Sequence, residues 1–181
     1  MSLLSYIELL ELVKSGVIDA DPKRINAASI DVTLDKTIRL EKTDGIFNID
    51  LSKKENIETF EHEIHPEHGF HLYPGQFILA STIEEFNLPD DIVSEYVCKS
   101  SMARNGLNHC LAGYGDPGWH SSKLTLELYN VTMAHRLLLK QGMPIGQVKF
   151  HRVTKVPGHA SYAATGQYNN QAKVTPSKGI R

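Results

Sequence analysis

The sequence is short of several features that mark whole classes of protein. Its 181 residues include two cysteines, too few for a disulfide framework, which favours a reduced cytoplasmic setting. No apolar run approaches the roughly 18 residues of a membrane-spanning helix, and no N-terminal stretch has the pattern of a secretion signal. The 19 basic and 21 acidic residues nearly cancel, so no net field favours nucleic acid. The sequence predicts one soluble cytoplasmic domain, with no membrane and no nucleic acid among its partners.

The pattern of apolar residues predicts a mainly β protein with one helix near the N-terminus. Ser5 and Glu8 have the spacing of a capping box, and Gly16 ends the helix that follows. Short β-rich segments then alternate with turn residues, as in an all-β barrel or sandwich. The expected strands are Ser29–Leu34, Thr37–Leu40, Phe70–Tyr73, Phe77–Ser81, Ile92–Cys98, Lys123–Asn130, Leu137–Leu139 and Gly146–His151. From Val156 the apolar pattern ends, and we expect an extended arm.

The clearest of these strands carries an acidic residue at its centre. Leucines alternate with polar residues along 123–130, so Thr125, Glu127 and Tyr129 share one face. Glu127 lies either on an exposed outer face, which periodicity alone favours, or points inward as a proton-transfer group with a raised pKa.

Two polar clusters are candidate binding sites. Lys99–Arg104 places two serine hydroxyls between two cations at a strand end, which suits phosphate oxygens, although such a turn also arises by chance. Asp116-Pro117-Gly118-Trp119 is a turn that holds the only tryptophan. It is either structural, with a packed indole, or places Asp116 against a sugar hydroxyl or water in a pocket rimmed by Trp119.

Metal sites are weakly supported. Histidines recur every third residue from His62 to His71 among glutamates, a composition that could hold a transition metal. Pro66 and Gly69 interrupt the segment, which favours a polar surface loop instead.

The signature of zinc-dependent base deaminases is incomplete. His65-Pro66-Glu67 matches its first half, but its Pro-Cys-x-x-Cys half is missing, because Cys98 and Cys110 stand twelve positions apart and neither follows a proline. The sequence therefore predicts no zinc, and both cysteines are expected to be small residues near the core.

Taken together, a series of motifs resembles the dCTP deaminase family, which shares its fold with the dUTPases. One such motif would be weak, but the set runs in family order through nearly the whole chain. The motifs are Arg24–Val32, Tyr73–Gly75, Leu88–Pro89, Lys99–Arg104, Ala112–Gly113 with Asp116–Gly118, Thr125–Glu127, Pro144–Gln147 and, in the tail, Tyr162, Tyr168, Gln171 and Thr175–Ser177.

The resemblance implies a dUTPase-type fold, a distorted, jelly-roll-like β-barrel with an N-terminal helix over residues 1–155. It also implies a homotrimer with active sites at subunit interfaces, and a C-terminal arm, residues 156–181, that closes over bound nucleotide. The implied reaction is hydrolysis of dCTP to dUTP and ammonia, with Mg²⁺ bound through the triphosphate and no catalytic metal. Feedback inhibition by dTTP is a further implication.

The resemblance also assigns roles to individual residues. Glu127 would shuttle protons between the attacking water, N3 and the leaving amine. The groups that hold the water and stabilise charge would be Ser100, Arg104 and the carbonyl of Ala112. The nucleotide would be contacted by Lys99, Ser100 and Ser101 at the phosphates, Asp116 at the 3′-hydroxyl, Thr125, Leu126 and Glu127 at the base, and Tyr162 and Gln171 at the triphosphate.

The chain departs from the family most clearly in the arm. The lysine that precedes the arm tyrosine, and contacts the terminal phosphate in the family, is Gln167 here. Lys173 is a candidate substitute, and a modified deoxycytidine nucleotide or one with fewer phosphates stays open as substrate.

Two alternatives to a dUTP-forming enzyme remain. A bifunctional enzyme would also remove diphosphate and release dUMP, and Ala112-Gly113 matches the bifunctional members. A catalytically inactive nucleotide-binding regulator is disfavoured because Glu127 and Arg104 are both retained.

Overall fold

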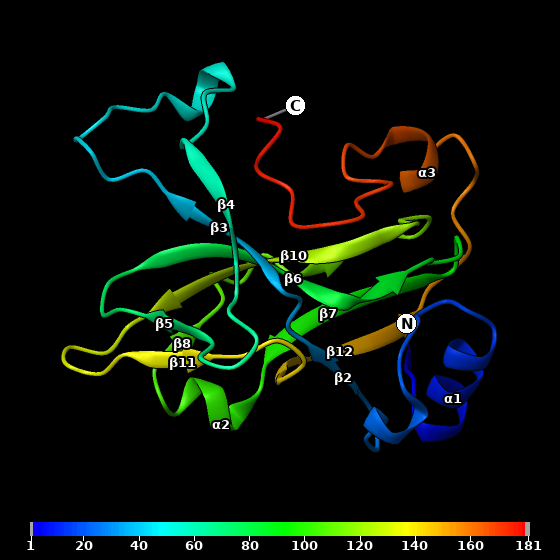
Figure 1. Cartoon of the computed structure of the whole chain (residues 1–181). Helices are drawn as coiled ribbons and strands as arrows, with labels where there is room; N and C mark the ends of the chain where they lie inside the picture. The colour runs from blue at the N-terminus through cyan, green and yellow to red at the C-terminus, as the bar shows by residue number, and fades with distance from the viewer. Residues whose placement is uncertain (1, 180–181) are drawn as a thin grey trace.

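The computed structural model describes residues 2–179 and shows the mainly β protein that the sequence predicts. Its strands form two five-stranded sheets and a two-stranded pair, all antiparallel, which share one hydrophobic core (Figure 1). The first sheet runs β1 (Ser2–Leu3), β12 (Pro144–Arg152), β7 (Ile92–Cys98) and β9 (Tyr114–Gly115), with β2 (Ile30–Thr33) also paired to β12. The second runs β4 (Thr59–Glu63), β3 (Thr37–Glu41), β6 (Phe77–Phe86), β10 (Ser122–Asn130) and β8 (Leu107–Asn108), and the pair is β5 (Phe70–Leu72) with β11 (Leu137–Leu139).

The helices are few and short. The predicted N-terminal helix is α1 (Tyr6–Lys14), and its capping box is formed, because the backbone N–H of Ser5 donates to Oε2 of Glu8 at 3.0 Å. Four further turns of helix were not predicted, since each is too short to show a period. They are the 3₁₀ turns η1 (Pro22–Arg24) and η2 (Leu51–Lys53), and the helices α2 (Ser100–Ala103) and α3 (Tyr162–Thr165). Within residues 2–179, no helix combines the length and apolarity needed to cross a membrane.

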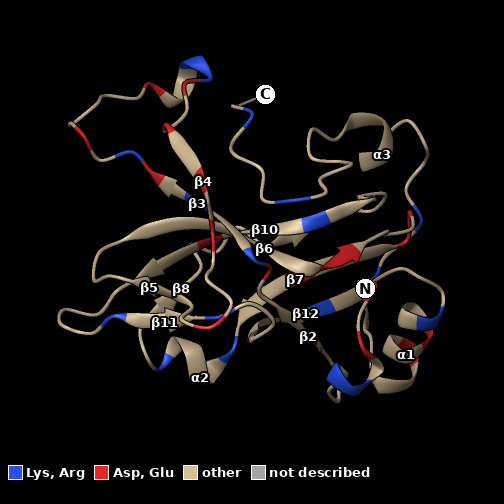
Figure 2. Cartoon of the chain, in the orientation of Figure 1, with Lys and Arg blue, Asp and Glu red and all other residues tan. Residues whose placement is uncertain are grey.

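The prediction of a surface loop around His62 is wrong in part, because residues 59–63 form the edge strand β4. Four of its five side chains are exposed, so the strand shows no apolar alternation that the sequence could reveal. It is held by backbone pairing with β3 and by an ion pair across the two strands, Arg39 to Glu61 at 3.2 Å. Figure 2 shows the acidic positions of β4 in red. Edge strands of this charged kind resist pairing with other chains.

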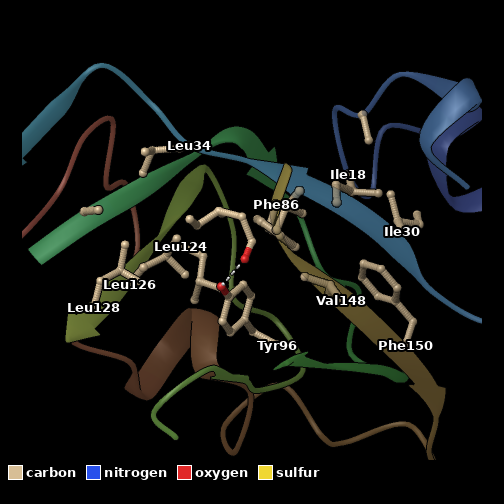
Figure 3. Close-up of a cluster of buried hydrophobic side chains, with 14 of the residues drawn as sticks. Ile18, Ile30, Leu34, Phe86, Tyr96, Leu124, Leu126, Leu128, Val148 and Phe150 are labelled. Carbon is tan, nitrogen blue, oxygen red and sulfur yellow. Dashed lines mark hydrogen bonds between the residues drawn. The ribbon is translucent and has the colours of Figure 1, made fainter. Parts of the chain in front are cut away.

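The core gathers around a stack of aromatic rings. Phe86 is fully buried, with its ring centroid 5.2 Å from that of Trp119 and 6.4 Å from that of Phe150. Tyr96 also lies in this cluster, and its buried hydroxyl donates a hydrogen bond to the carbonyl of Ile145 at 3.2 Å (Figure 3). The leucines at 124, 126 and 128 enter the same core from β10.

The chain after β12 folds back across β10 as the expected arm, but it is packed against the sheet. The backbone N–H of Lys123 donates to the carbonyl of Gln171 at 2.9 Å, and that of Thr175 donates to Oγ1 of Thr125 at 3.2 Å. Val174 between them is buried. The arm is therefore extended for most of its length yet contributes a buried apolar residue (Figure 1).

Replacing Phe86 with alanine tests the aromatic stack. We expect F86A to lower the free energy of unfolding by about 3–5 kcal/mol, because it leaves a cavity between two rings. Denaturant unfolding at matched protein concentration measures the loss. The control is I83A on the same strand, where the side chain is 39% exposed and the loss should be below about 1.5 kcal/mol. Equal losses in the two variants would contradict this description of the core.

Candidate active site

A cavity of about 470 Å³ lies between the second sheet and the arm. Its walls come from β6, β9, β10, α3, the later part of the arm and the loop before β4. The lining residues are Asn56, Ile57, Phe77, Leu79, Ala112, Tyr114, Gly115, Asp116, Trp119, Leu124, Thr125, Glu127, Tyr162, Tyr168, Gln171, Thr175, Pro176 and Ser177. The volume suits a small organic ligand, and the mixture of apolar and polar walls suits one with both kinds of group.

Glu127 lies in this cavity because of the alternation along β10. Its neighbours Leu126 and Leu128 face the core, and Glu127, opposite Leu79 of β6, faces the cavity. Burial raises the pKa of its carboxyl to about 7 and outweighs a backbone hydrogen bond, which lowers the pKa. Within residues 2–179, no side chain forms an ion pair or a hydrogen bond with it. Of the two orientations that the sequence left open, the structure shows the inward one, with a pKa suited to proton exchange near neutral pH.

The loop before Ala112 is strained and borders this carboxyl. Cys110 and Leu111 have φ values of 52° and 60°, a left-handed conformation that is uncommon in residues other than glycine. Ala112 and Glu127 line the same cavity, and the pKa of the exposed Cys110 is raised by partial desolvation and by the charge of Glu127. Gly113 is required next, because a Cβ there would lie 2.4 Å from Cβ of Tyr96. The strained backbone thus brings Ala112 to the cavity wall.

The turn at 116–119 is a structural turn that also borders the cavity. The backbone N–H of Trp119 donates to the carbonyl of Asp116 at 3.1 Å and closes the turn, and both residues line the cavity. The indole is buried on the core side, and its Nε1 donates to the carbonyl of Tyr168 in the arm at 2.8 Å. Trp119 therefore joins core, cavity and arm.

Gln171 carries an unmet hydrogen-bonding group at the cavity. Its side chain is 7% exposed, and Nε2 donates to the carbonyl of Tyr168 at 3.0 Å. Oε1 is buried and accepts no hydrogen bond from residues 2–179. Because buried amide oxygens are nearly always paired, this atom marks a place where a ligand or an ordered water would bond.

The structure brings together part of the expected site and leaves part of it elsewhere. The cavity holds six of the expected residues, namely Ala112, Asp116, Thr125, Glu127, Tyr162 and Gln171. The four basic-turn residues Lys99, Ser100, Ser101 and Arg104 lie at α2, on the other side of the sheets from the arm (Figure 1). Leu126 is in the core, which leaves only its backbone to meet a ligand, and Gln167 lies outside the lining.

The basic turn is positioned by the N-terminal signature. Nζ of Lys99 pairs with Oδ2 of Asp31 at 2.5 Å, and Nδ2 of Asn26 donates to the other oxygen of that carboxylate at 2.9 Å. Ser29 donates from its hydroxyl to Oε1 of Gln147 at 2.8 Å. The Arg24–Val32 motif therefore holds the basic turn, and the Pro144–Gln147 motif in turn contacts the Arg24–Val32 motif.

Some cavity residues were missed by sequence reasoning. Phe77 and Tyr114 come from strands whose partners the sequence does not specify, and Asn56 and Ile57 come from an irregular loop. A signal existed only for Phe77, which alternates with Leu79 on an expected strand.

The cysteines and histidines show no shared site. Cys98 is half-buried against the core, as expected, but Cys110 is exposed, so the expectation fails there. His65 and His68 stack with ring centroids 4.4 Å apart. Across residues 2–179, no three His, Cys, Asp or Glu side chains gather closely enough to hold a metal ion.

The fold and the cavity define a β protein with a preformed small-molecule pocket that contains a buried carboxyl. The chain belongs to the dCTP deaminase-like family, whose model matches residues 3–153. A Salinispora tropica relative named "dCTP deaminase, dUMP-forming" is 36% identical over 182 residues, covering 97% of this chain and 94% of the relative. A Mycobacterium tuberculosis relative of the same name is 38% identical over 187 residues, covering 99% of this chain and 96% of the relative.

A solved structure resembles the fold. The 2′-deoxycytidine 5′-triphosphate deaminase of Agrobacterium tumefaciens superposes with a TM-score of 0.65 and 17% identity. The match covers 84% of this chain and 48% of that one, so the chain corresponds to about half of its length. At this identity the likeness establishes the fold alone, and it agrees with the expected fold class.

The raised pKa of Glu127 makes stability depend on pH in a defined direction. Between the ordinary value of 4.5 and about 7, the folded protein keeps a proton on Glu127 that the unfolded chain has lost. Folding takes up that proton, so this contribution is complete below pH 4.5 and is lost as pH rises through 7. We expect E127Q to gain stability relative to the wild type, on the order of 2 kcal/mol, as pH rises over this interval.

Denaturant unfolding of both proteins at a series of pH values measures this difference. The control is E95Q, because the pKa of the exposed Glu95 is lowered by Lys149 and its contribution has the opposite sign. A difference between wild type and E127Q that stays flat from pH 4.5 to 7.5 would contradict the burial of this carboxyl.

Proposed function

We propose that this protein hydrolyses the 4-amino group of dCTP and then removes diphosphate, releasing dUMP. The observation that carries the proposal is the buried carboxyl of Glu127, whose pKa of about 7 lets it accept and return a proton at neutral pH. The resemblance alone put a dUTP-forming enzyme first, whereas the two relatives above favour the dUMP-forming alternative. Each of the two steps consumes one water, so one dCTP and two waters give dUMP, ammonia and diphosphate.

Deamination follows from the groups at the cavity wall. The carboxylate of Glu127 takes a proton from a water as its oxygen attacks C4 of the cytosine. The carbonyl of Ala112, on the strained loop, accepts the other hydrogen of that water. Glu127 passes the first proton to N3, takes the second proton from the new hydroxyl on C4 and delivers it to the amine, so that ammonia departs as the C4 carbonyl forms. Because burial raises the pKa of Glu127 to about 7, the carboxyl can both accept and release a proton near neutral pH.

The deoxyribose and base are held by neighbouring groups. Asp116 accepts from the 3′-hydroxyl, and Thr125 with the backbone of Leu126 reads the base edge. Oε1 of Gln171, which is buried without a partner among residues 2–179, accepts from the nucleotide or from a water bound to it. The arm, residues 156–181, acts as a cover on the β domain, and Tyr162 belongs to it.

The triphosphate requires cations that the cavity of one chain does not supply. Its lining includes the carboxyl groups of Glu127 and Asp116 and, within residues 2–179, no lysine or arginine. The basic turn at α2 offers Lys99, Ser100, Ser101 and Arg104, but it lies on the other side of the sheets. We therefore infer a homotrimer in which α2 of a neighbouring subunit completes each cavity. Mg²⁺ enters with the substrate, bound to phosphate oxygens and water.

Product analysis tests the proposal. The protein is incubated with dCTP and Mg²⁺, nucleotides are separated by chromatography and ammonia is assayed. We expect dUMP, diphosphate and ammonia in equal amounts, and ammonia production in E127Q reduced by at least about 10²-fold. The control variant is E95Q, which should keep full activity, and parallel reactions with dCDP, dCMP and dUTP define the substrate.

The other outcomes are distinct. Accumulation of dUTP with ammonia would establish the dUTP-forming alternative. Binding of dCTP without ammonia from any nucleotide would establish the regulator alternative and overturn the proposal. Competition by dTTP in the same assay tests the expected feedback inhibition.

A further inference from the structure

We propose that Lys178 is the residue that recognises the terminal phosphate, in place of a cation at position 167. This inference rests on the proposed function, because it assigns a group to the triphosphate of that substrate. It arises from the end of the arm, where the chain returns to the segment around Gln167 and Tyr168. No lysine or arginine lines the cavity within residues 2–179, so a cation that this same chain supplies to the nucleotide has to stand at the rim of the cavity.

Lys178 is fixed at this rim by three contacts. Its backbone N–H donates to the hydroxyl of Tyr168 at 3.0 Å, and its Nζ lies 5.2 Å from the centroid of the same ring. Nζ also donates to the carbonyl of Gln167 at 2.5 Å. Because Tyr168 and Ser177 both line the cavity, the ammonium of Lys178 rests on a wall residue. The ammonium therefore occupies the space beside residue 167, where Gln167 itself offers no charge.

Two other lysines near the arm are already neutralised. Nζ of Lys173 lies 2.5 Å from Oε1 of Glu61, and Nζ of Lys123 lies 2.6 Å from Oδ2 of Asp35. Lys178 forms no ion pair with a carboxylate of residues 2–179, and its partners are a carbonyl and an aromatic face. Its charge is therefore available to an anion, whereas Lys173, the substitute suggested by sequence, would first have to leave Glu61.

The contacts also leave donors free. A lysine ammonium has three N–H groups, and the carbonyl of Gln167 uses one of them, so two remain for phosphate oxygens. Charge-assisted bonds of this kind are about twice as strong as neutral ones. The chain beyond is held in place, because Gly179, with φ of +79°, lies against Lys54 so closely that a Cβ would be 2.5 Å from that of Lys54.

Substitutions at positions 178 and 167 test this assignment. The dissociation constants of dUTP and dUMP are measured by calorimetry without Mg²⁺, so that dUTP is not converted to dUMP during the titration. We expect K178Q to weaken dUTP by about tenfold or more and to leave dUMP within about twofold, because only the terminal phosphate loses its partner. The double variant Q167K/K178Q should recover most of the lost dUTP affinity. The matched control K173Q, on the same arm, should change dUTP affinity by less than about threefold.

The contrary results are equally definite. Unchanged dUTP affinity in K178Q, or equal weakening of dUTP and dUMP, would overturn the assignment, the second because it indicates a loosened arm. The same holds if Q167K fails to restore affinity to K178Q. The wild type is assayed for ammonia from dCTP alongside. Binding of dUTP without ammonia release would overturn the proposed reaction, while the binding comparison would still decide the role of Lys178.

Discussion

The pairing of β10 with β6 decides which side chains enter the core and which enter the cavity. The register runs from Thr125 opposite Ser81 to Tyr129 opposite Phe77, with an irregularity just before Thr125. There the hydroxyl of Thr82 accepts the backbone N–H of Leu124 at 3.0 Å and takes the place of the missing ladder bond. A slip of one residue would turn the leucines outward and bury Glu127 in the core, because strand side chains alternate. The buried carboxyl, the arm contacts and the cavity all depend on this register.

The same geometry explains why the site is divided. In the single chain, burial raises the pKa of Glu127, and the cavity around it contains no cation among residues 2–179. A triphosphate needs the opposite environment. The chain keeps the two apart, with Glu127 under the arm, a basic turn on the far side of the sheets and Lys178 beside Gln167. In the proposed trimer, neighbouring subunits bring these environments together around one nucleotide.

Much of the β framework was predictable because it depends on local alternation. Lys123–Asn130 was expected as a strand and forms β10 with one more residue, and Ile92–Cys98 is correct at both ends. β4 was missed because its exposed residues carry no pattern, and α2 and α3 because four residues are too few. Glu127 could be singled out, but its direction could not, since periodicity places a residue on a face without saying what covers that face. The cover is the arm, which depends on contacts about 50 residues apart, such as Thr175 with Thr125.

The central claim, that each site joins the cavity of one subunit to α2 of another, is tested most directly by subunit complementation. E127Q and R104A are co-expressed with different tags, and mixed assemblies are purified and assayed for ammonia from dCTP. Each variant alone is expected to be inactive. In every mixed trimer one of the three sites combines an intact Glu127 from one subunit with an intact Arg104 from its neighbour, so the purified mixed assemblies should recover about a third of the wild-type activity. Mixed assemblies as inactive as the parent variants would contradict a shared site.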